Sequence, residues 1–136
     1  MNYLLDTNAC IALINGNPVA VRKNLAKAVY AGSSLTTSAI VVHELWYGVA
    51  KSSRVAQNAQ ALAVFLSRDV AVLDFSEKDA QAAGEIRAEL ERHGKRIGEY
   101  DTLIAGQAFA RNLVLVTANT REFGRVKGLT VEDWTL

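Results

Sequence analysis

The 136-residue sequence contains a single cysteine, Cys10, and a single proline, Pro18. One cysteine can form neither an internal disulfide nor a cysteine-based zinc site, so we expect Cys10 to fill the core of a protein from a reducing compartment. No Ser/Gly-rich tract, block of like charge or internal repeat marks a linker. Half of the residues are hydrophobic, which is enough for one core. We therefore expect a single domain over residues 1–136.

Long apolar runs are also missing. No stretch remains apolar for the roughly 18 residues that a membrane span requires. The chain opens MNYLLDTNAC, where Asp6 interrupts any signal-peptide core. The expectation from these two absences is a soluble, cytoplasmic protein.

The formal net charge is only +1, but it is unevenly distributed. Between Arg92 and Lys127, seven Lys and Arg residues stand against three acids, so this stretch is net +4 and the rest is slightly acidic. Such a stretch is compatible with an anionic partner, and it is equally compatible with scattered, solvated surface charges.

Short apolar runs alternate with amphipathic segments along the whole chain, which predicts strands alternating with helices. Runs that are apolar throughout are typical of parallel strands covered on both faces, so we expect an α/β domain with a mainly parallel central sheet. The expected strands are residues 3–5, 35–37, 70–73, 113–116 and an edge strand at 129–131. The expected helices are residues 9–15, 18–30, 39–50, 55–66, 77–93 and 100–111.

Three small polar residues follow the first expected strand directly: Asp6, Thr7 and Asn8. In an open parallel sheet the working site lies beyond the carboxyl ends of the strands, where these residues offer a carboxylate, a hydroxyl and an amide around one point. All three residue types are also preferred helix caps. Taken alone, the triplet favours a cap.

Glu44 lies on the apolar face of its expected helix, where it falls between Ile40 and Val41 on the circumference. A glutamate in that place needs a partner to offset its desolvation. A metal ion is one such partner, a buried arginine is another, and a shift of the helix register would also remove the conflict. We favour a metal or catalytic role.

Asp101 repeats this pattern, because Ile104 and Ala105 lie one turn further on the same side of the expected helix. It also lies in the first turn, where the helix dipole alone would explain one aspartate. Three acids at helix starts or on apolar helix faces are harder to explain separately. Clustered carboxylates repel one another unless a cation is present, so their convergence implies a bound ion. With oxygen ligands only, that ion is expected to be Mg²⁺, or Mn²⁺ in its place.

A fourth candidate segment follows the last buried strand and reads Val116-Thr117-Ala118-Asn119-Thr120-Arg121-Glu122-Phe123. Asn119 and Glu122 are each able to ligate a metal or hold a water, and Arg121 can bind a phosphate. Nothing in the local sequence distinguishes this segment from an ordinary polar turn.

Four segments in order make the sequence resemble the VapC-type PIN-domain ribonuclease toxins. They are DTN at residues 6–8, SAIVVHELWYG around Glu44, IGEYDTLIAGQA around Asp101, and LVTANTREFGRVKGLTVEDW near the end. The resemblance implies a three-layer α/β/α PIN-like domain and a Mg²⁺-dependent endoribonuclease. It further implies that Asp6 and Asp101 hold Mg²⁺ and that Glu44 completes the acidic set.

The same resemblance implies inhibition by a cognate VapB-like antitoxin and cleavage of structured RNA, since similar members cut initiator tRNA in its anticodon region. Many PIN domains carry an aspartate where this chain has Asn119, so the fourth catalytic acid is either Glu122 or absent. Basic residues are candidates for tracking the RNA backbone. The candidate substrate-binding residues are Thr7, Asn8, Lys95, Arg96, Thr117, Asn119, Arg121 and Arg125.

Three other interpretations of the sequence compete with a toxin. A phosphatase of the haloacid dehalogenase type needs a second acid two residues after the first, and this chain has Asn8 there. A non-catalytic receiver-like module does not account for Glu44 and Asp101 on helix faces. A PIN nuclease acting in RNA processing remains open, and a neighbouring gene for a small antitoxin would decide the matter.

The sequence also predicts a homodimer. Two consecutive expected helices are apolar around more of their circumference than one core contact requires, and exposed apolar patches usually mark interfaces. A two-fold pairing of the same surface is the commonest arrangement. The residues concerned are Leu45, Trp46, Tyr47, Val49, Val55, Ala59, Leu62, Val64, Phe65 and Leu66.

Overall fold

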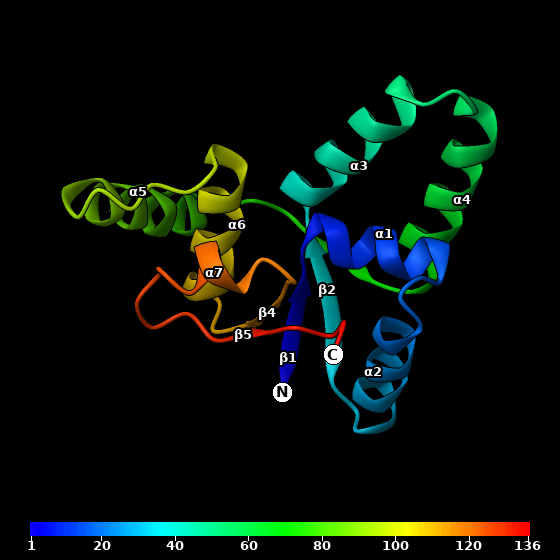
Figure 1. Ribbon diagram of the computed structural model, residues 1–136, viewed down its shortest axis with the longest axis horizontal. Helices are drawn as coiled ribbons and strands as arrows, with labels where there is room; N and C mark the ends of the chain where they lie inside the picture. The colour runs from blue at the N-terminus through cyan, green and yellow to red at the C-terminus, as the bar shows by residue number, and fades with distance from the viewer.

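A computed structural model describes all residues from 1 to 136 and shows one five-stranded sheet with seven helices around it (Figure 1). The strand order is β3-β2-β1-β4-β5, and every neighbouring pair is parallel. The strands are β1 (Asn2–Leu5), β2 (Ser34–Ser38), β3 (Ala71–Leu73), β4 (Val114–Val116) and β5 (Val131–Glu132). The helices are α1 (Thr7–Asn15), α2 (Val19–Tyr30), α3 (Ala39–Lys51), α4 (Val55–Arg68), α5 (Glu77–Arg92), α6 (Glu99–Ala110) and α7 (Thr120–Phe123).

The expected α/β architecture is confirmed, and the sheet is parallel throughout. The edge strand differs from the prediction, because β5 begins at Val131 and pairs with β4 through Leu115↔Val131 and Val116↔Glu132. The helix α7 was not predicted, since its four residues are too few to show a periodic pattern. None of the helices is both long and apolar enough to cross a membrane.

The centre of the core is β1, which lies between β2 and β4. Leu4 and Leu5 of this strand are fully buried, as are Leu115 of β4 and Cys10 of α1. A strand in the middle of a parallel sheet has both faces covered, which explains why its apolar run is continuous rather than alternating. Cys10 is a free, buried thiol that fills the core, as predicted.

The helices begin where the sequence places capping residues. Ser38 ends β2 and caps α3 by accepting a hydrogen bond from the backbone N–H of Ile40 at 3.0 Å. Ser76 and Asp79 form a capping box at the start of α5. Because β1 and β2 point to the same edge of the sheet, α1 and α3 both start at that edge, and Figure 1 shows the start of α6 beside them.

The helices α5 and α6 pack closely against each other. A Cβ atom built on Gly106 of α6 would lie 2.6 Å from the backbone of Ala83 on α5, so only glycine permits this approach. Beside this contact, the guanidinium of Arg111 donates to both carboxylate oxygens of Asp79 at 3.2 and 2.9 Å and to the carbonyl of Asp74 at 2.7 Å. The Gly106–Ala83 contact and the hydrogen bonds of Arg111 therefore fix the position of α6 relative to α5.

Asp79 is 1% exposed, yet it is charged in the folded protein. Burial opposes ionisation, but hydrogen bonds from Arg111 and Ser76 outweigh it and lower the pKa of the Asp79 carboxyl. Because the pKa of Asp79 is lower in the folded protein than in the unfolded chain, ionised Asp79 stabilises the fold at any pH above its unfolded-state pKa. This stabilisation is lost as the pH falls through the folded-state pKa of Asp79.

We predict that Asp79→Asn lowers the free energy of unfolding by about 2 kcal/mol at pH 7, because charge-assisted hydrogen bonds are lost and Arg111 loses its carboxylate. Urea denaturation measures this loss, which should shrink in strong acid. The matched control is Glu89→Gln on the same helix, where the acid pairs with Arg92 and His93 at the surface. Equal urea midpoints for the two variants would show that the buried Asp79–Arg111 pair stabilises the fold no more than a surface ion pair does.

Candidate active site

Asp6 directly follows β1 at its carboxyl end, and the residue is 6% exposed. Its backbone N–H donates to the carbonyl of Val116 at 3.1 Å, which ties the ends of β1 and β4 together. Its Oδ1 accepts the backbone N–H of Ala9 at 2.8 Å and so caps α1. The helix cap considered for the DTN triplet is therefore real, and it fixes a carboxylate at the edge of the sheet.

The pKa of Asp6 is raised, principally because burial disfavours the charged form. The hydroxyl of Thr117 and the N–H of Ala9 lower it, whereas the negative charges of Glu44 and Asp133 raise it further. No Lys or Arg contributes to this balance. The carboxylate is thus held near two other acids without a cation from the protein.

Glu44 lies on α3, half-buried, on the side of the helix that faces α1. Its Oε1 accepts a hydrogen bond from the hydroxyl of Thr7 at 2.8 Å. The buried arginine considered as a partner is not there, because no salt bridge includes Glu44. Thr7 therefore connects the first and second acids of the site.

Asp101 lies in the first turn of α6 and is half-buried. Burial and the charges of Glu44, Asp6 and Glu122 raise its pKa to about 6, and no cation offsets them. Asp101 thus lies within electrostatic range of three acids from other parts of the fold, namely Glu44, Asp6 and Glu122.

Glu122 belongs to α7, whose residues were expected to form a polar turn. The side chain of Asn119 donates to Oε2 of Glu122 at 3.1 Å, and the N–H of Asn119 donates to the buried Thr117 hydroxyl at 3.0 Å. Phe123 is buried and anchors the turn. Asn119 therefore positions the carboxylate of Glu122 through this hydrogen bond.

Asp133 is an acid at this edge that sequence reasoning missed. It follows β5, it raises the pKa of Asp6, and it lines a cavity of about 200 Å³ together with Asn8 and Thr117. Its Oδ1 accepts hydrogen bonds from the N–H and hydroxyl of Thr135 at 2.9 and 2.6 Å. The signal was available, because Asp133 follows a strand in the same way as Asp6 does.

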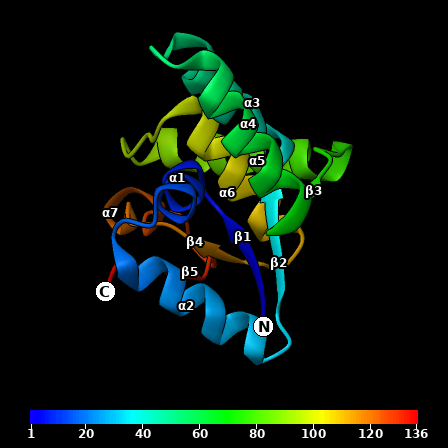
Figure 2. The same cartoon turned by 90° about the vertical axis from the view of Figure 1, so that its right-hand side faces the viewer.

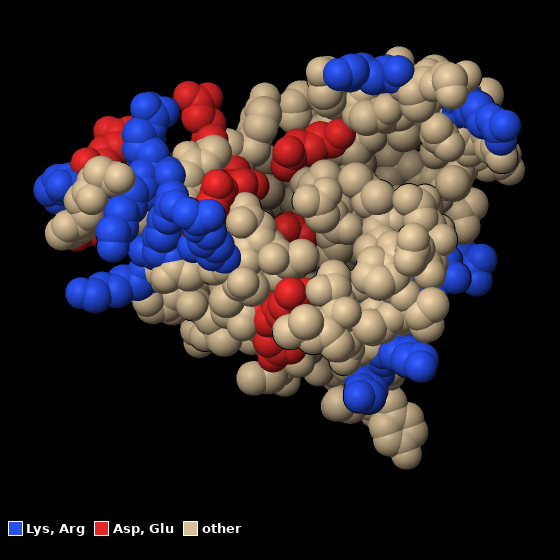
Figure 3. Space-filling model, in the orientation of Figure 1, with Lys and Arg blue, Asp and Glu red and all other residues tan.

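The basic candidates lie beside the acids rather than among them. Lys95, Arg96 and Arg121 are exposed, and Arg125 donates to the carbonyl of Arg96 at 2.9 Å. This contact joins the segment after α7 to the loop before α6. Figure 3 shows Lys and Arg side chains gathered over the α5 and α7 side of the molecule, next to a band of acidic side chains.

The acidic set fits a hard divalent cation by its chemistry. All of its donors are oxygens, and the repulsion that raises the pKa of Asp101 is the kind that a bound cation relieves. As the side chains stand, no three His, Cys, Asp or Glu groups lie close enough together to hold a metal ion. Small side-chain movements toward a cation are therefore needed for ligation.

Comparison with known proteins agrees with this architecture. A family model for the PIN domain matches residues 3–129. Ribonuclease VapC2 of Rickettsia felis is 44% identical over 134 residues, covering 98% of each chain. The tRNA(fMet)-specific endonuclease VapC of Shigella flexneri is 43% identical over 137 residues, covering 99% of each chain.

Solved structures show the same likeness. A chain of the crystal structure of VapBC2 from Rickettsia felis, bound to a DNA fragment from their promoter, superposes with a TM-score of 0.92 at 42% identity, covering 98% of this chain and 99% of that one. A chain of DNA-bound VapBC from Salmonella typhimurium gives 0.90 at 40% identity, covering 98% of each. The chain belongs to the PIN-domain family. Within that family it is of the VapC type, which confirms the resemblance seen in the sequence.

The raised pKa of Asp101 has a consequence for stability. Folding raises the pKa of the Asp101 carboxyl from 3.8 to about 6. The free energy of unfolding therefore falls as the pH rises from about 4 to about 6, and the whole loss of stability is present above pH 6. We predict that Asp101→Asn raises the free energy of unfolding by about 1 kcal/mol at pH 7.5, a value reduced for screening because the group is half-exposed. At pH 3.5 the variant should match the wild type.

Thermal unfolding at the two pH values measures this difference, with an expected rise of about 3 °C at pH 7.5. The control is Asp69→Asn, which removes an exposed acid at the end of α4. A fall in melting temperature at pH 7.5 would show that the carboxylate of Asp101 is structural.

Proposed function

We propose that this protein is a Mg²⁺-dependent endoribonuclease toxin of a type II toxin-antitoxin pair. The observation that carries the proposal is the grouping of Asp6, Glu44 and Glu122 around Asp101. Burial and the negative charges of these three acids raise the pKa of Asp101 to about 6, and no cation of the protein offsets them. The VapC ribonucleases that match nearly the whole chain support the same activity.

In this proposal Asp6 and Asp101 hold Mg²⁺, with Mn²⁺ as a substitute, because both carboxylates stand at the sheet edge and Asp6 is fixed by its cap. When bound, such a cation neutralises the scissile phosphate and lowers the pKa of water. Glu44, positioned by the hydroxyl of Thr7, accepts the proton of the attacking water. Glu122, held by Asn119, completes the set.

The proposed substrate is structured RNA, and tRNA in particular. The Shigella flexneri relative is named as specific for tRNA(fMet), so initiator tRNA is the first substrate to test. Lys95, Arg96 and Arg121 carry exposed positive charge beside the acids and would follow the phosphate backbone. Since each phosphate contact releases counterions, RNA affinity should fall steeply as salt rises.

The proposed protein partner is a VapB-like antitoxin. Three of the similar solved structures are VapBC complexes, and two of these three are bound to DNA. An antitoxin that covers the acidic edge would block RNA, so co-expression with the product of an adjacent reading frame should give a stable, inactive complex.

The decisive test is Mg²⁺-dependent cleavage of tRNA by the purified protein, followed on denaturing gels. Asp6→Asn is expected to reduce cleavage at least 100-fold, because the removal of one charge-stabilising group typically has an effect of this order. Asp69→Asn, an exposed acid far along the chain, should cleave as the wild type does. Cleavage that persists in EDTA or in Asp6→Asn would refute the proposed function.

The same assay separates the roles of Glu122 and Asn119. Glu122→Gln should reduce cleavage about 10-fold or more, since only a carboxylate adds negative charge for a cation or accepts a proton. Asn119→Ala should have a smaller effect, because it removes the hydrogen bond to Glu122 but keeps the charge. If Glu122→Gln cleaves tRNA as fast as the wild type, this site has no fourth functional acid.

We also propose a homodimer formed by α3 and α4. Trp46, Tyr47, Val55 and Val64 are 41%, 59%, 47% and 43% exposed, which leaves an apolar surface on these two helices. Leu45, Leu62 and Phe65, included in the expected surface, are instead buried in the hydrophobic core. The predicted interface is therefore narrower than the sequence suggested.

Sedimentation at micromolar concentration tests the dimer. We predict a species of about twice the 14.7 kDa chain mass, which becomes monomeric in Trp46→Glu. Tyr30→Glu, on α2 and 96% exposed, is the matched control and should remain dimeric. A wild-type protein that sediments as a monomer at all concentrations would refute the interface.

A further inference from the structure

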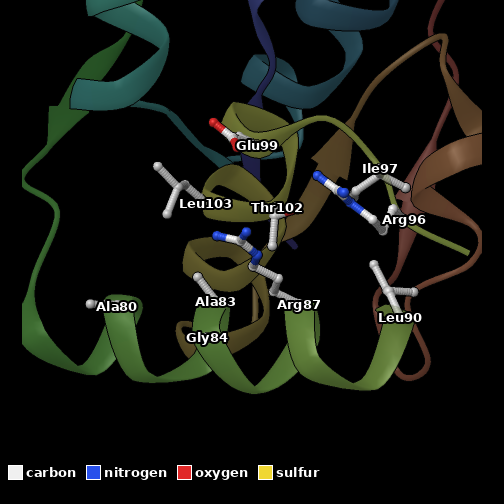
Figure 4. Close-up of a pocket in the computed structure, with 10 residues that line it drawn as sticks. All are labelled: Ala80, Ala83, Gly84, Arg87, Leu90, Arg96, Ile97, Glu99, Thr102 and Leu103. Atoms are coloured by element: carbon white, nitrogen blue, oxygen red, sulfur yellow. The ribbon is translucent and has the colours of Figure 1, made fainter. Parts of the chain in front are cut away.

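A cavity of about 330 Å³ lies between α5 and the first half of α6, with one side formed by the loop that precedes α6 (Figure 4). This volume falls within the range of small-ligand pockets, which begins at about 300 Å³. Its walls are largely apolar and come from both helices and the loop. The apolar lining residues are Ala80, Ala83, Leu90, Ile97 and Leu103.

Two arginines project into this cavity. In Figure 4 the guanidinium groups of Arg87 and Arg96 both point into the space between the helices. Oε2 of Glu91 lies 3.0 Å from Nε of Arg87 and 4.0 Å from Nε of Arg96, so one carboxylate orients both side chains. The terminal Nη atoms of the two arginines donate to no acceptor in the protein. They are free to bind a ligand.

The cavity and one of the proposed catalytic acids share the first turn of α6. Glu99, Thr102 and Leu103 line it, and Asp101 lies between them in the sequence on the opposite side of α6. The separation is about the width of a helix, roughly 10 Å. An RNA strand that places its phosphate at Asp101 therefore has its neighbouring nucleotides within reach of the cavity.

We propose that this cavity binds one nucleobase of the RNA substrate close to the scissile bond; this inference rests on the proposed function. A base has flat apolar faces that suit the walls formed by Ala83, Ile97 and Leu103, and its edge carries acceptors for the Nη donors of Arg87 and Arg96. A phosphate alone would use the arginines but not the apolar walls. The pocket would therefore select substrate through a base, whereas the surface cations act on the backbone.

Gly84 provides the test variant, because it lines the cavity and a Cβ built there meets no atom within 4 Å. Gly84→Leu fills the cavity with an apolar side chain and raises the helix propensity of α5, so it should fold. The matched control is Gln81→Leu, at an exposed position on the same helix outside the cavity lining.

The measurement is the affinity for the RNA fragment that the wild type cleaves, followed by fluorescence anisotropy in EDTA so that the RNA stays intact. Fragments carry a single abasic nucleotide at successive positions around the scissile bond. In the wild type, one abasic position should weaken binding about tenfold, as expected for the loss of one stacked base. Gly84→Leu should weaken binding of the intact fragment about tenfold. In this variant, the abasic nucleotide that weakens binding to the wild type should cause no further loss of affinity. Gln81→Leu should behave as the wild type.

Arg87→Ala supplies a second comparison, with Arg92→Ala as its control, because Arg92 pairs with Glu89 away from the cavity. Arg87→Ala should reduce the same abasic penalty, and Arg92→Ala should leave it unchanged. If the losses of affinity caused by the abasic nucleotide and by Gly84→Leu are additive, and the wild type still cleaves RNA, the proposed base-binding pocket is refuted. If the wild type cleaves no RNA in Mg²⁺, the proposed function itself fails.

Discussion

Repulsion between carboxylates at the carboxyl edge of the parallel sheet is the constraint on which this structure depends. Burial and three neighbouring acids raise the pKa of Asp101 to about 6, and burial with two acids raises that of Asp6. A fold keeps such an arrangement only where the surrounding structure holds the acids in place. Here the hydrogen bonds of the Asp6 cap and the Thr7–Glu44 pair do so. The repulsion in turn makes the edge a site that favours a divalent cation.

The fold brings these acids together through parallel pairing. Because β1 and β4 run in the same direction, Asp6 and the segment leading to Glu122 end at one edge. The contact of Gly106 with Ala83 and the Asp79–Arg111 ion pair then fix α6, and with it Asp101. The same α5–α6 pair encloses the cavity that contains Arg87 and Arg96. Helix α6 therefore contributes both to the acidic edge and to this cavity, and Figure 2 shows α5 and α6 in the perpendicular view.

Much of this was predictable from the sequence, because apolar strands and helix caps are local signals. Asp6, Glu44 and Asp101 were found from strand ends and helix faces alone. Glu122 remained ambiguous, since a four-residue helix has no periodicity and the Asn119 hydrogen bond is a tertiary detail. Asp133 was missed because the edge strand begins two residues later than expected. The burial of Phe65 could not be predicted either, because it depends on how α3 and α4 pack.

The central claim is that the clustered acids bind a divalent cation, and anomalous diffraction from crystals grown with Mn²⁺ tests it most directly. The account predicts an anomalous peak between the carboxylates of Asp6 and Asp101, and loss of that peak in Asp101→Asn crystals grown in the same way. A Mn²⁺ peak at some other place on the surface, or crystals of active protein with no peak between these two carboxylates, would contradict it.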